Sequence, residues 1–434
     1  MMGKLRPINV GDRQLYYSGS GEGGSGGDDG VSALYCEFVF MEEVQPELLK
    51  RAAQEASRYI WPFRQTLVWH NGTLMYEEND ADPPIFPRSS KTFYLATADT
   101  NGYLYYILYE GKSMYLCFAH GLGDAMTGQY FCHFLVHRYL SLLHPEQMPF
   151  DAEDAFQKLN FWQGEDAFDF LASVGKQQKR PPMGGACRLP KEHFLDKDDM
   201  YCMDMPREEF VRVLTELDTS PATFLMALLG RAIRKTYKVG RRNVLAFIAA
   251  DLRRVFDRNT IDGFLGAANV SYQPEYDAMA LKEVCARMRR DLQTQLTREN
   301  SVGFVSMYAK LLKLRESKWL STALGRRLSR KVEHLGMEAA FTYDMTYVSL
   351  HKLQAEFGEE VARIDGYYRT NAASSFILLN REQTVSIRVT EYTGGKALLD
   401  QLRAELGALG IHSECSVRRV PHYARLDLST LRNV

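Results

Sequence analysis

Apolar and polar residues follow two different periods along the chain, which indicates a protein that mixes strands with helices. Runs rich in β-branched and aromatic residues predict strands, and some of these runs are paired around a short turn. The predicted strands and hairpins are 31–42, 65–79 with a turn at Asn71-Gly72, 103–120 with a turn at Glu110–Lys112, 243–252, 339–350 and 375–392.

Segments with apolar residues at helical spacing lie between these strands. Two helix starts are marked in the sequence, by Pro46 in a first turn and by Thr219-Ser220-Pro221, where a hydroxyl cap and a proline precede an apolar periodic run. The predicted helices are 46–59, 126–143, 207–217, 222–237, 280–295, two stretches within about 303–335, and 396–406. The order of elements predicts the α/β (α+β) class in two layered subdomains.

Two polar segments interrupt this pattern. Residues 176–199 contain proline, glycine and charge without any period, and they predict a linker. We therefore expect an N-terminal subdomain over 1–175 and a C-terminal subdomain over 200–434. The glycine- and serine-rich stretch 18–30 predicts a flexible surface loop.

Composition narrows the class of protein. The chain has 434 residues, more than one ordinary core needs. Its 53 basic and 54 acidic residues give a net charge of −1, so nucleic acid and anionic membranes are not expected partners. The seven cysteines show no CxxC spacing and predict free thiols in a reducing compartment. Without a signal-peptide core or a membrane-length apolar run, a cytoplasmic location is expected.

The stretch YLCFAHGLGDAMTGQY (115–130) carries the main candidate for chemistry. A predicted strand ends at His120, and two glycines lead to Asp124. An imidazole, with an unperturbed pKa near 6.5, suits a general base that removes a proton from an attacking alcohol or amine. Gly121 and Gly123 permit backbone angles that other residues resist, which would hold the ring in one orientation. By spacing alone, a loop histidine without a catalytic role is the simpler interpretation.

The context of this stretch resembles a known family. A strand ending in His-x-x-x-Asp and followed by a helix, in a chain of this length with a linker near its middle, resembles the chloramphenicol acetyltransferase-like superfamily. That group includes condensation domains, BAHD acyltransferases and alcohol acetyltransferases, with the signature HHxxxDG or HxxxDG. Ala119 stands at the first histidine of the longer signature and Ala125 at its final glycine. The DFGWG motif of BAHD enzymes has no counterpart, which disfavours that branch.

The resemblance implies two chloramphenicol acetyltransferase-like subdomains, each a mixed sheet flanked by helices, with a central channel between them. It implies no bound cofactor and a thioester co-substrate, either acyl-CoA or an acyl-phosphopantetheine on a carrier protein. It also implies direct transfer in a ternary complex, with His120 as general base and Asp124 as the structural aspartate.

Two later segments resemble other parts of the family. VLAFIAADLRR (244–254) is similar to a strand ending in a D/N-L-R triplet, and we expect Asp124 to pair with Arg253 or Arg254. LGAANVSYQP (265–274) is similar to a family segment containing asparagine. Asn269 or Ser271 could donate a hydrogen bond to the tetrahedral oxyanion, a turn role being the alternative.

His133 and His137 have the i, i+4 spacing of metal-binding helices. No acidic residue follows in the HExxH manner, so the sequence favours core or surface histidines and no metal is expected. No phosphate loop or GxGxxG motif indicates a nucleotide.

The sequence thus predicts an acyltransferase moving an acyl group from acyl-CoA to the hydroxyl or amine of a small molecule. The alternatives are a condensation-type enzyme using carrier-bound acyl groups, and a degenerate member of the family that binds ligand without catalysis.

Overall fold

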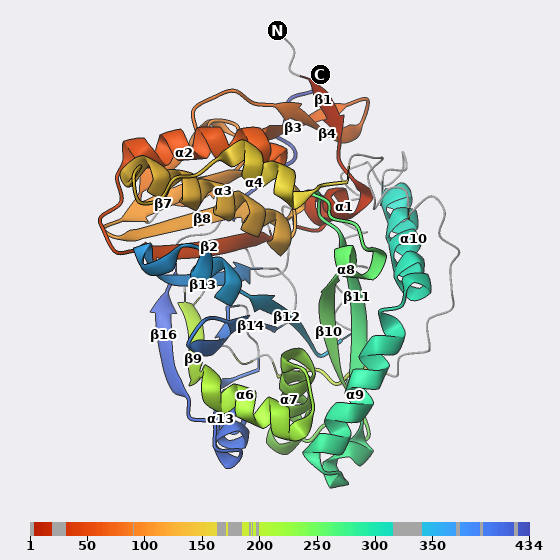
Figure 1. The fold of residues 1–434 in the computed structure, drawn as a ribbon. Helices are drawn as coiled ribbons and strands as arrows, with labels where there is room; N and C mark the ends of the chain where they lie inside the picture. Colours follow the sequence, from red (N-terminus) through yellow and green to blue (C-terminus); the bar gives the residue numbers. More distant parts are fainter. Residues whose placement is uncertain are drawn as a thin grey trace.

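The computed structural model describes residues 4–19, 32–89, 91–162, 171, 185–190, 192, 194–196, 199–315, 341–369, 374–390, 394–420 and 424–434. Two large mixed sheets, each flanked by helices, make up the molecule (Figure 1), which confirms the predicted fold class. Much of the predicted linker 176–199 and most of the glycine-rich stretch 18–30 lie outside the described residues.

The first sheet has five strands and supports the helices of the N-terminal half. In spatial order these are β13 (Val361–Arg369), β2 (Ala33–Phe40), β8 (Ser113–Ala119), β7 (Tyr105–Glu110) and β5 (Ile85–Pro87). Only the β5–β7 pair of this sheet is parallel. Helices α2 (Pro46–Tyr59) and α3 (Ala125–Leu143) pack against each other and over the sheet (Figure 1), and their apolar sides join its core.

The second sheet has seven strands. In spatial order these are β11 (Leu265–Tyr272), β10 (Val244–Asp251), β12 (Tyr343–Ser349), β14 (Ser375–Asn380), β15 (Thr384–Val389), β9 (Asp199–Pro206) and β16 (Glu414–Arg419). The outer face is covered by α6 (Arg207–Leu217), α7 (Pro221–Thr236), α9 (Leu281–Gln295) and α13 (Lys396–Ala408), with α10 (Arg298–Arg315) alongside (Figure 1). The opposite face is therefore directed toward the N-terminal half.

The remaining elements are short. The strands are β1 (Leu5–Pro7), β3 (Gln65–His70) and β4 (Thr73–Glu78), which form a three-stranded sheet, and the pair β6 (Phe93–Tyr94) and β17 (Ala424–Arg425). The helices are α1 (Val10–Gly19), α4 (Ala152–Leu159), α8 (Leu252–Phe256) and α12 (His351–Glu356). Single 3-10 turns are η1 (Trp61–Arg64), η2 (Ala98–Thr100), η3 (His120–Leu122), η4 (Pro274–Ala278) and η5 (Gly358–Glu360).

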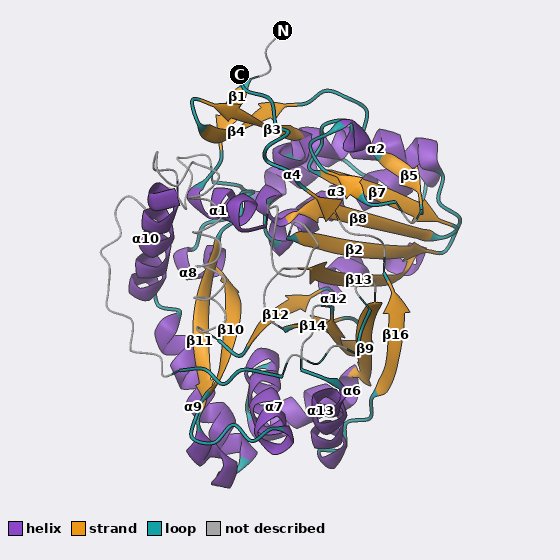
Figure 2. Cartoon of the chain, turned by 180° about the vertical axis from the view of Figure 1, so that it is seen from behind, coloured by secondary structure: helices purple, strands orange, loops and turns teal. Residues whose placement is uncertain are grey.

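The two sheets do not divide the chain at one point in the sequence. Strand β13 comes from the C-terminal half but pairs with β2 of the first sheet, on the side that faces the second sheet (Figure 2). Near the C-terminus, β17 pairs with β6 and Asn433 bridges to Trp69. The division of the chain into subdomains 1–175 and 200–434 stays a prediction.

A cluster of charged side chains beside β13 connects the two sheets through ion pairs. Arg388 of β15 donates from Nε and Nη2 to the two carboxylate oxygens of Asp365 in β13, at 3.2 and 3.0 Å. Arg418 of β16 donates to Asp365 at 3.0 Å and to Glu37 of β2 at 2.7 Å. Burial alone would raise the pKa of Asp365, but the surrounding arginines lower it. The carboxylate is therefore ionised and bridges strands from both sheets.

All seven cysteines are among the described residues, and each is a free thiol. Five of them are buried, in agreement with their positions in apolar runs, while Cys36 is half-buried and Cys415 exposed. Among the described residues, no helix is both long enough and apolar enough to cross a bilayer.

Candidate active site

His120 lies at the point where β8 ends and η3 begins. Its backbone N–H donates to the carbonyl of Ser32 at 2.8 Å, which extends the pairing of β8 with β2 by one bond. The carbonyl of His120 accepts from the N–H of Gly123 at 3.3 Å and closes the turn. The histidine is thus fixed to the end of a central strand.

The two glycines of the loop are needed for space. A Cβ on Gly121 would lie 2.7 Å from ring atoms of Tyr16, and one on Gly123 would lie 2.5 Å from Cβ of Thr127. Neither glycine occupies the left-handed region, since the φ of Gly123 is 163° and Gly121 is not among the positive-φ glycines. The sequence-based argument from backbone freedom was wrong, because the loop uses glycine for close packing.

Two tyrosine hydroxyl groups support the loop that follows His120 through hydrogen bonds. Tyr76 of β4 donates its hydroxyl proton to the carbonyl of Gly121 at 2.8 Å. The hydroxyl of Tyr16 in α1 lies 3.0 Å from that of Tyr76. Burial raises the pKa of both phenols, so they remain protonated hydrogen-bonding groups at neutral pH.

The imidazole of His120 is half-buried, and its Nδ1 has no hydrogen-bond partner among the described residues. Burial lowers the pKa of His120, and the opposing effects of its own backbone carbonyl and of the Asp124 charge are smaller. The ring is therefore neutral at pH 7 and can accept a proton. A neutral imidazole at a strand end, with an unpaired ring nitrogen, has the properties of a general base.

Asp124 is buried, and both of its carboxylate oxygens accept hydrogen bonds from the protein. It is 1% exposed and caps α3, where its Oδ1 accepts from the N–H groups of Met126 and Thr127, both at 3.0 Å. Its Oδ2 accepts from Arg253 at 2.7 Å and from the N–H of Phe264 at 2.9 Å. Burial alone would raise the pKa of Asp124, but the Arg253 guanidinium and these hydrogen bonds lower it. Asp124 is consequently an ionised structural group.

Arg253 uses each of its donors. Nε donates to the carbonyl of Thr260 at 2.8 Å, and Nη1 donates to Asp124 at 2.7 Å and Asp251 at 3.1 Å. Nη2 donates to Asp124 at 3.2 Å and to the carbonyl of Asp262 at 2.6 Å. A guanidinium has five N–H groups, and all five have acceptors here. Arg254, the other candidate, is exposed.

Two carboxylates of the N-terminal half accept hydrogen bonds from the backbone of the segment between α8 and β11. The N–H of Gly263 donates to Asp12 of α1 at 3.2 Å, and the next N–H, of Phe264, donates to Asp124. A Cβ on Gly263 would lie 2.1 Å from Oδ1 of Asp12, so only glycine allows this approach. Asp12 was not anticipated from the sequence, where nothing in its spacing marks it.

Asn269 and Ser271 lie on β11, farther from the histidine loop. Asn269 is five residues beyond Phe264, which is about 17 Å along a strand. Its Oδ1 and the Oγ of Ser271 are buried without a partner among the described residues. Their assignment as oxyanion donors stays a prediction.

Asp344 of β12 is a further titratable group that sequence reasoning missed. It shares a cross-strand row with Phe247 of β10 and Asn269 of β11, so the three side chains lie on one face of the sheet. Tyr368 donates to its Oδ2, while Oδ1 is buried without a partner among the described residues. Burial raises the pKa of Asp344 to about 7. An acidic residue inside the apolar run AAFTYDMTYVSL was the available signal.

No family model and no curated protein sequence matches the chain. Solved structures do match in fold. TRI101 of Fusarium sporotrichioides, in complex with coenzyme A and T-2, has a TM-score of 0.62 at 10% identity, covering 95% of this chain and 99% of that one. The trichothecene 15-O-acetyltransferase TRI3 of the same organism has a TM-score of 0.56 at 10% identity, covering 93% and 94%.

A condensation domain is similar to the same degree. The domain from the monacolin K polyketide synthase MokA has a TM-score of 0.58 at 11% identity, covering 94% of this chain and 97% of that domain. Identities this low establish the fold and not the reaction. Over nearly its whole length, the chain has the fold that these two acetyltransferases and this condensation domain share.

Proposed function

We propose that this protein is an acyltransferase that moves an acyl group from a thioester to a hydroxyl or amine of a small molecule. The observation that carries the proposal is the neutral imidazole of His120, whose Nδ1 has no hydrogen-bond partner among the described residues, on a loop held by the Asp124–Arg253 pair. The same fold binds coenzyme A in TRI101, which supports a coenzyme A thioester as donor.

In the proposed mechanism, His120 removes the proton from the acceptor's hydroxyl or amine as that group attacks the thioester carbonyl. The resulting tetrahedral oxyanion collapses, the carbon–sulfur bond breaks, and the imidazolium returns its proton to the leaving thiolate. The acyl group passes directly between substrates, and no covalent bond to the enzyme forms. Asp124 takes no part in proton transfer, because all its hydrogen bonds hold α3 and the segment before β11.

The alternative donor is an acyl group on the phosphopantetheine arm of a carrier protein, as the similarity to a condensation domain suggests. The chemistry at His120 would be the same. A separate alternative is a protein that binds an acyl-pantetheine without transferring the acyl group.

Release of free thiol distinguishes these possibilities. The wild-type protein is incubated with acetyl-CoA and a panel of alcohols and amines, and thiol is measured with and without each acceptor. Acceptor-dependent release supports transfer from coenzyme A. Release only from an acyl-carrier protein would indicate the condensation-type donor. Tight binding of acyl-pantetheine without turnover from either donor would reject catalysis.

The pH dependence of kcat/KM reports the protonation state of the base. Because burial lowers the pKa of His120 below its ordinary value of about 6.5, its neutral form should persist into mildly acidic solution. We expect kcat/KM to be constant near pH 7 and to fall as the pH drops through an inflection below about 6.5.

Asp344 provides the control for this profile, since its pKa of about 7 makes it titrate in the same pH range. The Asp344→Asn protein should keep the acidic limb at the same pH. If the limb disappears in that variant, Asp344 and not His120 controls the profile.

A further inference from the structure

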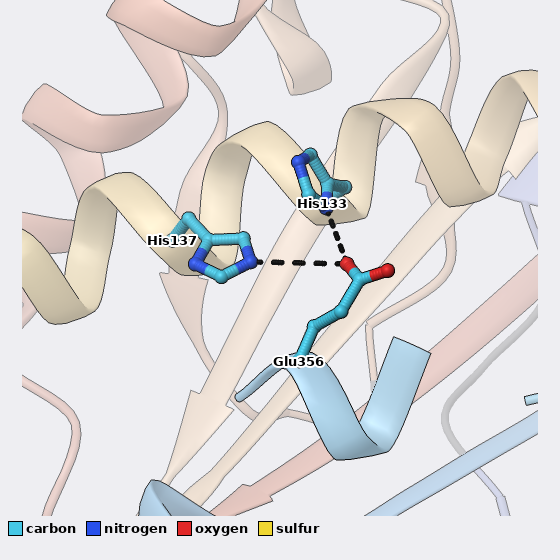
Figure 3. Close-up of side chains that lie close together, drawn as sticks. All are labelled: His133, His137 and Glu356. Atoms are coloured by element: carbon cyan, nitrogen blue, oxygen red, sulfur yellow. Dashed lines mark hydrogen bonds and ion pairs between the residues drawn. The ribbon is translucent and has the colours of Figure 1, made fainter. Parts of the chain in front are cut away.

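Three side chains from two halves of the chain meet away from the histidine loop. His133 and His137 lie one turn apart on α3, and Glu356 is the last residue of α12; Figure 3 shows all three directed toward one another. Oε2 of Glu356 lies 2.8 Å from Nδ1 of His133 and 3.9 Å from Nε2 of His137. One donor atom from each residue falls within 4.8 Å of the others.

The donor set matches the preferences of zinc. Two imidazole nitrogens and one carboxylate oxygen are a common three-residue zinc set, with water in the fourth position. Metal–ligand distances of about 2.0–2.2 Å place neighbouring ligands of a tetrahedral ion about 3.3–3.6 Å apart. The observed separations bracket this range, so small side-chain movements would complete the site. Mg²⁺ and Ca²⁺ prefer oxygen ligands and suit it poorly.

We propose that His133, His137 and Glu356 bind a zinc ion that joins α3 to α12. The exposed side of the site leaves room for water as fourth ligand, since the Glu356 side chain is 47% exposed. The sequence favoured no metal here because no acidic residue follows the histidines. The third ligand, Glu356, lies 223 positions after His133 in the sequence, and the fold brings the two side chains together.

The surrounding residues hold the ligands in place. The ring of His137 stacks on Phe150, with centroids 5.2 Å apart and planes 12° apart, and also contacts Phe357 at 4.7 Å. Such positioning reduces the entropy lost when a metal binds.

The metal site is distinct from the proposed active site but lies on the same helix. His133 is nine residues beyond Asp124, about 14 Å along α3. Asp124 already joins the start of α3 to Arg253 of the C-terminal half. Zinc at Glu356 would therefore add a further connection between α3 and the C-terminal half of the chain.

Titration of the metal-free full-length protein with ZnCl₂, followed by calorimetry, tests the proposal. Wild type should bind one zinc ion per chain. His133→Gln and Glu356→Gln should each weaken binding by at least the roughly 10–100-fold seen when a supporting residue of a metal site is removed. The matched control is His144→Gln, at the end of the same helix, whose ring lies 3.7 Å from Glu42 and 3.6 Å from Glu360 without a second histidine. This control should bind zinc as wild type does.

Cobalt(II) and thermal unfolding give readouts that do not depend on affinity alone. Bound Co²⁺ should show visible ligand-field bands without a thiolate charge-transfer band, and zinc should raise the unfolding temperature of wild type but not of His133→Gln. Circular dichroism establishes that each variant is folded, and His137→Gln replaces any that is not. Absence of stoichiometric binding, equal binding by wild type and the ligand variants, or a thiolate band would each overturn the proposal.

Discussion

Replacing His120 with alanine is expected to lower the rate of acyl transfer by about 10²- to 10⁴-fold, the usual contribution of a general base. This corresponds to about 3–5 kcal/mol of transition-state stabilisation. The reason is structural: Nδ1 of His120 has no hydrogen-bond partner among the described residues, so replacing the ring removes a proton acceptor without breaking a hydrogen bond at that atom. The measurement is thiol release from acetyl-CoA at saturating acceptor, at neutral pH.

The His412→Ala protein is the matched control for loss of an imidazole. The side chain of His412 is 85% exposed and pairs with Glu209 at the surface, so its removal should leave the rate unchanged. KM for both substrates should change little in His120→Ala, because the proposed role is in the chemical step. A His120→Ala protein with near-normal turnover would exclude His120 as the base.

The second large effect is expected at the Asp124–Arg253 pair. Asp124→Asn removes the negative charge from a side chain that is 1% exposed and leaves the charge of Arg253, 6% exposed, without its main partner. Breaking such a buried pair from one side typically costs about 3–5 kcal/mol of the free energy of unfolding. Denaturant unfolding monitored by fluorescence and by circular dichroism measures the loss. Activity should fall as well, because Asp124 caps the helix that follows the histidine loop.

Arg253→Met should destabilise the protein by a similar amount, since it leaves the Asp124 charge buried. The adjacent Arg254→Ala is the control, and as an exposed substitution it should change the free energy of unfolding by less than about 0.5 kcal/mol. The double variant Asp124→Asn/Arg253→Met should be less destabilised than the sum of the single variants, because the two side chains interact directly. Additive losses, or a fully stable Asp124→Asn protein, would show that the pair does not support the fold.

Local signals in the sequence predicted the local elements well. The helix predicted at 46–59 is α2 (Pro46–Tyr59), and that at 207–217 is α6 (Arg207–Leu217). Ser220 caps α7 through the N–H of Thr223, as its hydroxyl and the following proline indicated. The hairpin turn at Asn71-Gly72 has positive φ at both residues, as this dipeptide favours. These features depend on neighbours within a few positions, which a sequence displays directly.

The parts that were missed depend on contacts between distant segments. Strand β13 (Val361–Arg369) was not predicted, since its pairing with β2 joins residues more than 300 positions apart. Asp12 and Glu356 acquire their roles only when α1 meets the segment before β11 and α12 meets α3. Asp344 was visible as an acidic residue in an apolar run, but its burial and its contact with Tyr368 follow only from the fold. Such assignments require the fold.

The candidate active site also combines features that the local sequence predicted with features that required the fold. The position of His120 at the end of a strand and of Asp124 at the start of a helix followed from the pattern around them, and the structure has both. Choosing between Arg253 and Arg254 required the direction of each side chain at the start of α8. Adjacent residues of a helix point in different directions, and the sequence does not show which of the two points toward Asp124. The functional roles of Asn269 and Ser271 stay predictions.

A crystal structure of the protein with acetyl-CoA tests the central claim most directly. The account predicts that the thioester lies beside the ring of His120, with a ring nitrogen about 2.6–3.2 Å, or one water, from where the acceptor's proton would lie. Asp124 should remain paired with Arg253 and should not contact the ligand. Acetyl-CoA bound elsewhere, with its thioester out of reach of His120, would contradict the account.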